Sequence, residues 1–333
     1  MPEQPPLTAP LRIGDVQLAN RVLLAPLAGI GNWFVRLQAR RHGAGLAVSE
    51  MVSSFGIHHR NERTMREMLR VHPDEHPVSV QLFGQDPDVM RSAAGTVAEA
   101  GADLIDLNMG CPVPKVCKTG SGVAMLGEPD LAVAVARAAV EGGGGLPVTV
   151  KLRSGLYEGD TRGFDLAVRL AADAGVAAIG FHPRHAKVHH RGAPDYELTH
   201  RLGERLDIPL IVSGGLHSAQ EARDAYAASG ADAVMIARGS FGNPFIFGEL
   251  TGRRDRPAGR EEIVGELLWV IDRAVEHFGE PRAARYLRRF YPWYLERMGE
   301  PKAVIAAFQQ FDDTDEPRRR LREMVAEPVP VAA

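Results

Sequence analysis

Short apolar runs rich in β-branched residues recur from residue 22 to residue 236, and helix-patterned segments separate them. Strands that alternate with helices build parallel sheets whose faces the helices cover. Because eight such runs are present, a closed (β/α)8 TIM barrel of the α/β class is favoured over a doubly wound open sheet. We interpret as strands the runs Val22–Leu24, Leu46–Ser49, Val78–Leu82, Leu104–Leu107, Val148–Lys151, Ala178–His182, Leu210–Val212 and Ala233–Ile236.

The pattern changes after about Leu250. Residues Thr251–Gly259 are polar and contain Gly and Pro, as linkers do. Beyond them the spacing of apolar residues is purely helical. We therefore predict a TIM-barrel domain over residues 1–252 and a small all-helical C-terminal domain over residues 258–325.

Composition narrows the class of protein further. Of the 333 residues 45% are apolar, enough for a sizeable core, and the formal net charge is −3. A small basic nucleic-acid-binding domain would lie well above neutrality, so any contact with nucleic acid must come from local patches. The sequence shows no metal-site spacing of Cys and His, no apolar run of membrane-spanning length and no signal-peptide pattern. We expect a cytoplasmic monomer that uses no metal and no membrane segment.

Polar side chains stand near the ends of three predicted strands, where the chemistry of a barrel gathers. Lys151 ends the fifth strand, His182 ends the sixth, and Gln81 lies near the end of the third. Lys151 could stabilise negative charge on a bound cofactor or pair with a carboxylate of the barrel. His182 fits a cofactor contact or a hydrogen-bonded wall residue equally well, and Gln81 alone is weak support for either.

Glycines follow the last two predicted strands. The turns are Ser213-Gly214-Gly215 and Ala237-Arg238-Gly239. Barrels commonly hold a phosphate at these two places, on bare backbone N–H groups and a helix N-terminus. Glycine would serve a tight turn as well, but the two pairs together favour a small bound molecule that carries a phosphate.

Cys111 lies in a Gly-Cys-Pro turn directly after the fourth predicted strand. A thiol exposed there can act as nucleophile, metal ligand or proton donor, and a buried inert cysteine is the alternative. No second Cys or His lies at ligand spacing, which weakens the metal interpretation. Cys117, in the lysine-rich loop that follows, is expected to be incidental.

The run Asp106-Leu107-Asn108-Met109-Gly110-Cys111-Pro112 resembles the tRNA-dihydrouridine synthase family, nearer its bacterial B-type branch. Asn-x-Gly-Cys-Pro in this setting is a specific signal. The resemblance extends from about residue 10 to about residue 300. Other segments match the family in the same order: Leu24–Ile30, Gly45–Met51, Gln81–Gly84, Lys151–Gly155 and Arg238–Phe247.

The resemblance implies a barrel that binds FMN and a helical domain that helps to hold tRNA. Members of the family reduce the C5–C6 double bond of specific uridines to 5,6-dihydrouridine, with NADPH as reductant, hydride delivered to C6 and a proton to C5. By position, Cys111 would donate that proton. The implied FMN contacts are Pro26, Leu27, Ala28, Gln81, Lys151, His182, Ser213, Gly214, Gly215, Ala237 and Arg238. The implied substrate contacts are Asn108, Arg184, Arg285 and Arg288, of which Asn108 would position the uracil or the flavin.

Two arginine stripes suit an RNA substrate in spite of the negative net charge. A uridine that leaves its stack needs basic and aromatic surroundings, although an arginine stripe is often only a solvated helix face. The first stripe is Arg60, Arg63, Arg66 and Arg70, and the second is Arg282, Arg285, Arg288 and Arg289, beside several aromatic residues.

Some positions depart from the family pattern. The family's His-x-Arg-Thr-Arg becomes His182-Pro183-Arg184-His185-Ala186, and the phosphate turn has Ser-Gly-Gly in place of Asn-Gly-Asp. Three alternatives stay open. The first is a flavin-dependent barrel oxidoreductase acting on a small pyrimidine or another non-tRNA substrate. The others are a tRNA-binding protein without catalysis and a flavin-free isomerase or aldolase in which Lys151 forms a Schiff base.

Overall fold

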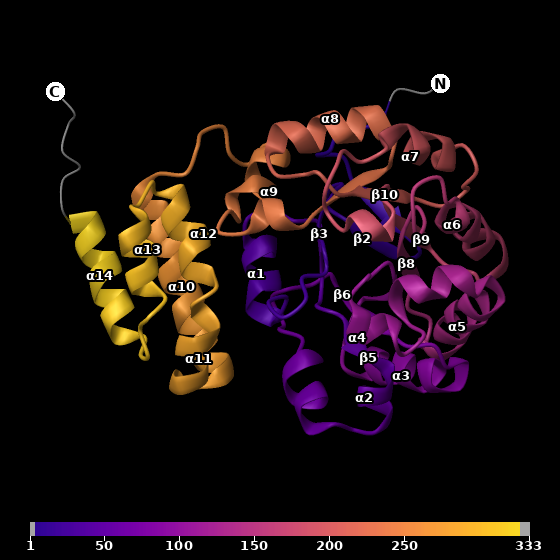
Figure 1. Cartoon of the computed structure of the whole chain (residues 1–333), viewed down its shortest axis with the longest axis horizontal. Helices are drawn as coiled ribbons and strands as arrows, with labels where there is room; N and C mark the ends of the chain where they lie inside the picture. Colours follow the sequence, from indigo (N-terminus) through magenta and orange to yellow (C-terminus); the bar gives the residue numbers. More distant parts are fainter. Residues whose placement is uncertain (1–3, 327–333) are drawn as a thin grey trace. The chain divides into compact units, whose positions relative to one another are not determined.

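The computed structural model describes residues 4–326, and eight parallel strands close into a barrel within it (Figure 1). Strand β4 pairs with both β3 and β6, and β11 pairs with β3, so the ring is complete. The TIM barrel predicted from the sequence is confirmed. The strands are β3 Val22–Leu24, β4 Leu46–Val48, β6 Val78–Phe83, β7 Leu104–Met109, β8 Val148–Arg153, β9 Ala178–His182, β10 Leu210–Ser213 and β11 Ala233–Ile236.

Three of these strands, β3, β9 and β11, begin and end where the sequence predicts. Strands β7 and β8 run further, to Met109 and Arg153, and β6 and β10 are also longer than predicted. The additional residues include Asn108 and Arg153, whose polarity ended the apolar pattern. They stay in the sheet because strand pairing continues through Asn108 and Lys151 and through Arg153 and His182.

A hairpin at the start of the chain closes the amino-terminal end of the barrel. Its strands β1 Leu11–Ile13 and β2 Val16–Leu18 pair antiparallel. The buried side chains of Leu11, Ile13 and Leu18 belong to one cluster with residues that begin the barrel strands, such as Leu104 and Ala178. The only remaining strand of the described residues, β5 Val52–Ser53, pairs with the end of β6. Neither β5 nor the hairpin was predicted from the sequence.

Helices connect the strands and cover the outside of the barrel (Figure 1). Asp86 caps α3 by accepting hydrogen bonds from the N–H groups of Asp88 and Val89, and Gly230 ends α8 with φ of +62°. The longer helices are α1 Trp33–Arg41, α3 Pro87–Glu99, α5 Pro129–Gly142, α6 Arg162–Asp173, α7 Tyr196–Gly203 and α8 Ala219–Ser229. The shorter ones are α2 Ser54–His58, η1 Thr64–Met68, α4 Pro114–Cys117, η2 Gly122–Gly127, η3 Ala186–Val188, η4 Arg238–Ser240 and α9 Phe245–Leu250.

The chain divides into two compact units. The first holds the barrel up to Gly239 together with Ile246–Arg253, and the second holds Ser240–Phe245 and the chain from Arg254 on. Helices make up the second unit, as expected for the C-terminal region. They are α10 Arg260–Phe278, α11 Glu280–Leu287, α12 Phe290–Arg297, α13 Lys302–Phe308 and α14 Asp315–Ala326.

The segment Ser240–Phe245 belongs to the helical unit although it follows the last barrel strand. The ring of Phe241 stacks on that of Trp293, with 4.3 Å between centroids. Gly242 passes so close that a Cβ would lie 2.4 Å from the carbonyl oxygen of Trp293. Within residues 4–326, no helix combines the length and the apolar character needed to cross a membrane.

Candidate active site

Three polar side chains lie in register across neighbouring barrel strands. Gln81 on β6 stands beside Asp106 on β7, and Asp106 stands beside Thr149 on β8. The Asp106 carboxylate accepts a hydrogen bond from Gln81 Nε2 at 2.6 Å and one from Thr149 Oγ1 at 2.5 Å. Burial raises the pKa of Asp106 to about 6, although both hydrogen bonds and Lys151 act against the rise. Asp106 had no predicted role, because its only signal in the sequence is a carboxylate inside an apolar strand.

Asn108 connects this layer to the turn that carries Cys111. Its Nδ2 donates to Gln81 Oε1 at 2.9 Å and approaches Met51 Sδ at 3.6 Å. Its Oδ1 accepts from the backbone N–H groups of Gly110 and Cys111 at 3.2 and 3.0 Å. The whole hydrogen-bonding capacity of the Asn108 amide is thus used within the chain.

The Cys111 turn is also held from its other side. The half-buried Cys117 thiol donates to the Cys111 carbonyl oxygen at 3.4 Å, so Cys117 supports the turn. Gly122, with φ of +63°, passes so close that a Cβ would lie 2.6 Å from the same oxygen. Arg153, which was not predicted as a site residue, is buried and donates to the Gly110 carbonyl oxygen at 3.0 Å. Cys111 itself is half-buried and forms no disulfide.

Lys151 stands next to Asn108 in the sheet, and Gly180 on β9 leaves space for its side chain. Burial and the charge of Arg153 lower the pKa of Lys151 to about 8, although Asp106 and Cys111 act against the fall. Residues 4–326 give its ammonium group no hydrogen bond and no ion pair. The alternative of a direct hydrogen-bonded pair with a barrel carboxylate is therefore not realised among these residues.

His182 and Arg184 pack against the glycine turn after β10. A Cβ on Gly214, which has φ of +99°, would lie 2.3 Å from His182 Nε2. Arg184 Nη1 lies 3.2 Å from the same nitrogen, and the Arg184 guanidinium donates to the carbonyl oxygen of Gly192. Burial and the nearby cations Lys151, Arg153 and Arg184 lower the pKa of His182, which keeps its ring neutral.

His190 is a further residue that was not predicted from the sequence. Its ring lies parallel to that of His182, with 6.1 Å between centroids. Burial and then the charges of Arg238, Arg153 and Arg184 lower the pKa of His190 to about 4. Several cations therefore gather at the ends of β8 to β11, as a site for an anionic group requires.

The turns after β10 and β11 lie at the same end of the barrel as these cations. Ser213 is buried, and Tyr196 fixes the Gly214 carbonyl by donating to it at 2.8 Å. A Cβ on Gly215 would lie 2.8 Å from the hydroxyl oxygen of Tyr196. Beyond the half-buried Ala237, the exposed Arg238 has no ion pair among residues 4–326. Gly214 and Gly215, which have no side chains over their backbone, and the uncompensated charge of Arg238 would suit an anionic group such as a phosphate.

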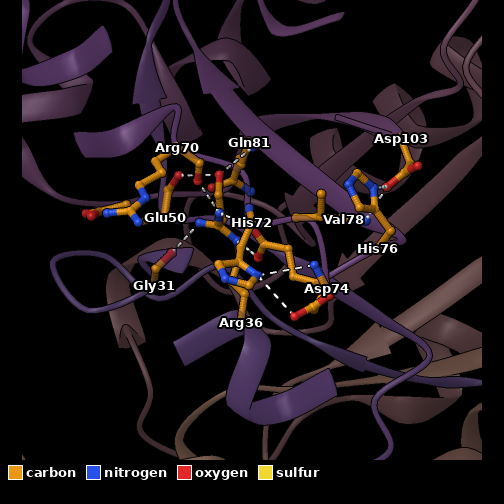
Figure 2. Close-up of polar contacts among 12 residues, drawn as sticks. Gly31, Arg36, Glu50, Arg70, His72, Asp74, His76, Val78, Gln81 and Asp103 are labelled. Carbon is orange, nitrogen blue, oxygen red and sulfur yellow. Dashed lines mark hydrogen bonds and ion pairs between the residues drawn. The ribbon is translucent and has the colours of Figure 1, made fainter. Parts of the chain in front are cut away.

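A buried ion pair anchors the loop after β3, which carries Pro26, Leu27 and Ala28. Arg36 bonds the carboxylate of Glu75 at 2.7 and 2.9 Å. The same guanidinium donates to the carbonyl oxygens of Gly31 and Arg70 (Figure 2).

The end of that loop is hydrogen-bonded to the segment that follows β4. Glu50 accepts a hydrogen bond from the Gly29 N–H at 2.8 Å. Along the loop, Pro26 is half-buried, Leu27 is buried and Ala28 is exposed. The backbone of the predicted flavin contacts is thus held in place by charged side chains outside the site.

The two arginines predicted to bind substrate in the helical unit differ from each other. Arg285 on α11 is exposed, whereas Arg288 bonds Asp312 at 2.5 Å. In the first arginine stripe, Arg66 pairs with Glu62 at 2.9 Å and Arg63 lies 3.5 Å from Glu67. Much of the basic charge is therefore neutralised locally, which favours a solvated face for these arginines. No metal-binding group of three His, Cys, Asp or Glu occurs in the described part of the chain.

Comparison with known proteins agrees with this arrangement. A family model described as dihydrouridine synthase matches residues 23–329. The tRNA-dihydrouridine synthase B of Pseudomonas aeruginosa is 34% identical over 322 residues, which cover 95% of this chain and 96% of that protein. A probable tRNA-dihydrouridine synthase of Mycobacterium tuberculosis is 36% identical over 324 residues, which cover 92% of this chain and 83% of that protein.

Solved structures share the barrel at much lower sequence identity. Morphinone reductase superposes with a TM-score of 0.56 and 18% identity, covering 77% of this chain and 92% of that one. A 2-naphthoyl-CoA reductase superposes with a TM-score of 0.60 and 12% identity, covering 74% of this chain and 52% of that one. At these identities the likeness shows the fold alone.

Proposed function

Since the chain belongs to the dihydrouridine synthase family, we propose that it reduces the C5–C6 double bond of specific uridines in tRNA to 5,6-dihydrouridine. In this proposal NADPH first reduces the bound FMN. When bound, FMN supplies the hydride that uracil C6 accepts. Cys111 Sγ–H gives its proton to C5 as the double bond is lost, and solvent reprotonates the thiolate.

One observation supports this function above the others. The Cys111 turn is held at three points by Asn108, Cys117 and Arg153, at the same end of the barrel as the unpaired Lys151. Cys111 lies near enough to Lys151 to raise its pKa. A positioned thiol beside a cation is what proton donation to a carbon next to a bound anionic cofactor needs.

The residues fit FMN at both of its polar ends. The Lys151 ammonium group has no hydrogen bond or ion pair in the described residues, and it can neutralise charge near N1 and the C2 carbonyl of a reduced flavin. Gly214, Gly215 and Arg238 can receive the phosphate. His182 lies between these groups and stays neutral, so it can donate one hydrogen bond and accept another.

Two exposed apolar side chains suit contact with tRNA beside the target uridine. Val113 and Tyr157 are 46% and 47% exposed and are the exposed large hydrophobic residues of the described chain. They lie in the loops after the neighbouring strands β7 and β8. Arg162 and Lys187 each lie 5.5 Å from the Tyr157 ring, so cations accompany the ring as RNA contacts require.

The proposal also bears on location and assembly. A tRNA substrate implies work in the cytoplasm, as we expected from the sequence. All the groups named for the chemistry come from one barrel, so a monomer suffices for it.

The first test uses the visible spectrum of the purified protein, followed by NADPH and unmodified tRNA. We expect flavin bands, and we expect a mass gain of about two daltons at a uridine, from the hydride and the proton added. Flavin bands without product on any tRNA would contradict the tRNA substrate and favour a small pyrimidine. A colourless protein that also fails to bind added FMN would contradict the flavin.

A further inference from the structure

A chain of side-chain hydrogen bonds leads from a buried carboxylate to the Cys111 turn. The Asp106 carboxylate accepts from Gln81 Nε2, and Gln81 Oε1 accepts from Asn108 Nδ2. Asn108 Oδ1 then accepts from the N–H groups of Gly110 and Cys111. We call this series the amide relay.

Both ends of the amide relay have fixed polarity. An ionised carboxylate only accepts hydrogen bonds, and a backbone N–H only donates them. Between these ends, each side-chain amide has one orientation that satisfies both of its neighbours. Reversing either amide would set donor against donor or acceptor against acceptor inside the barrel, where an unpaired polar group is costly.

We propose that Asp106 is a positioning residue for Cys111. Its carboxylate sets the direction of the Gln81 and Asn108 amides, and Asn108 in turn holds the backbone of the Cys111 turn. Asn108 thus also acts on the reaction through Cys111. This role rests on the proposed function only in that Cys111 is the proton donor.

Thr149 and Lys151 complete the surroundings of the carboxylate. Thr149 donates to the oxygen of Asp106 that Gln81 does not use. Lys151 is not hydrogen-bonded to Asp106 within residues 4–326 but lies within electrostatic range of it. Asp106 could therefore act in two ways, by directing the amides or by balancing the charge of Lys151, and the two make opposite predictions for Asp106→Asn.

Asp106→Asn preserves the amide relay. The oxygen of the new side-chain amide still accepts from Gln81, and its NH2 group can donate to the Thr149 hydroxyl, which both donates and accepts. We expect the iodoacetamide alkylation rate of Cys111 and kcat to change much less than in Asn108→Asp, because every buried group keeps a partner. If Asp106 instead acts by balancing the charge of Lys151, this variant should show the full loss of activity, because its side chain carries no charge.

Asn108→Asp opposes the polarity of the amide relay. Its carboxylate still accepts from the Cys111 turn, but it presents an acceptor to Gln81 Oε1. We expect Cys111 alkylation to change and kcat to fall by about tenfold or more, with KM for tRNA changed less, because a buried group is left unpaired. Alkylation is followed in the purified protein on the tryptic peptide containing Cys111, with the separate Cys117 peptide as internal reference.

The double variant Asp106→Asn with Asn108→Asp decides between the explanations. In this variant the side-chain amide of Gln81 can flip, so that it donates to the carboxylate now at position 108 and accepts from the amide now at position 106. The amide relay then runs in the opposite direction, and every group keeps a partner. We expect the double variant to have a kcat at least about tenfold higher than that of Asn108→Asp alone. No restoration would overturn the proposal and leave Asn108 as a direct substrate contact.

Relief of repulsion between the two carboxylates of the Asn108→Asp variant would also restore activity, so the cycle is repeated with Gln81→Met. If Gln81 transmits the polarity, restoration falls below about threefold in that background because the transmitting amide is gone. Equal restoration with methionine would contradict the amide relay. Alkylation tests the relay even if no tRNA is reduced, so a failed substrate assignment and a failed relay give different results.

Discussion

The two halves of the barrel mouth are built on different principles. Along β6 to β8, polar side chains satisfy one another: Asp106, Gln81 and Asn108 form the amide relay that ends at Cys111. Around β10 and β11, Gly214 has no side chain over its backbone, and Arg238 has no ion pair among residues 4–326. One half is ordered by its own hydrogen bonds, whereas the other leaves a charge without a partner in the described residues.

This difference teaches where each kind of precision is needed. A proton donor must be positioned within a fraction of an ångström, and internal hydrogen bonds achieve that. A phosphate is attracted by charge and backbone dipoles, which tolerate variation in side chains. The departures from the family pattern, such as Ser213 and Ala237, lie in the half that relies on backbone.

The largest effect is expected in the half formed by β6 to β8, from Cys111→Ala. Turnover of tRNA uridine should fall by about 10²–10⁴-fold, the range for loss of a general acid. Flavin content should stay unchanged, because the cofactor contacts lie elsewhere. Single-turnover reduction of tRNA measures the loss, and Cys117→Ser, which keeps a hydroxyl donor for the turn, is the control. Equal losses of turnover in the two variants would contradict the role of Cys111 as proton donor.

In the half around β10 and β11, the largest effect is expected from Gly214→Ala. The new Cβ would lie 2.3 Å from the buried His182 Nε2, at a backbone angle that favours glycine. We expect a loss of about 2–3 kcal/mol in the free energy of unfolding, together with most of the bound flavin. Gly101→Ala is the matched control, because Gly101 has φ of +87° with nothing within 4 Å of its Cβ position. Similar results for both would mean that backbone strain alone is responsible.

Lys151→Met tests the unpaired cation between the halves. Burial lowers the pKa of Lys151 to about 8, so the free protein loses this charge as pH rises through 8. Wild-type affinity for FMN should therefore be full below pH 8 and decline above it. The variant should bind about tenfold more weakly at pH 7, the effect of losing one charge-assisted hydrogen bond to the flavin ring, with little change between pH 7 and 9. Fluorescence titration with FMN measures both, and a wild-type affinity that does not change with pH would contradict this role.

The smallest effect is expected outside both halves, from Tyr157→Ala. Loss of one exposed aromatic contact should raise KM for tRNA about fivefold, near the lower end of what base stacking contributes, with kcat unchanged. Tyr157→Phe should retain wild-type KM because the ring remains. A KM unaffected by the alanine substitution would exclude Tyr157 from the RNA surface.

Much of this protein could be predicted from its sequence. The strands β3, β9 and β11, the family and the positions of Cys111, Lys151 and the glycine turns follow from local pattern and motif. Strand β7 was predicted too short because Asn108 ends the apolar run, although it continues the sheet. The hairpin Leu11–Leu18 was missed because its residues are buried only once the barrel exists to pack against them.

The sequence by itself determined which elements form and which chemical groups stand at the strand ends, because side-chain period and turn residues are local properties. Only the tertiary structure decided which hydrogen bonds those groups form. Asp106, Gln81 and Asn108 come from two strands, and the register between those strands sets their pairing. Arg288 is likewise neutralised by Asp312, which comes from a different part of the helical unit. Such contacts depend on distances between segments far apart in the chain, which no local pattern carries.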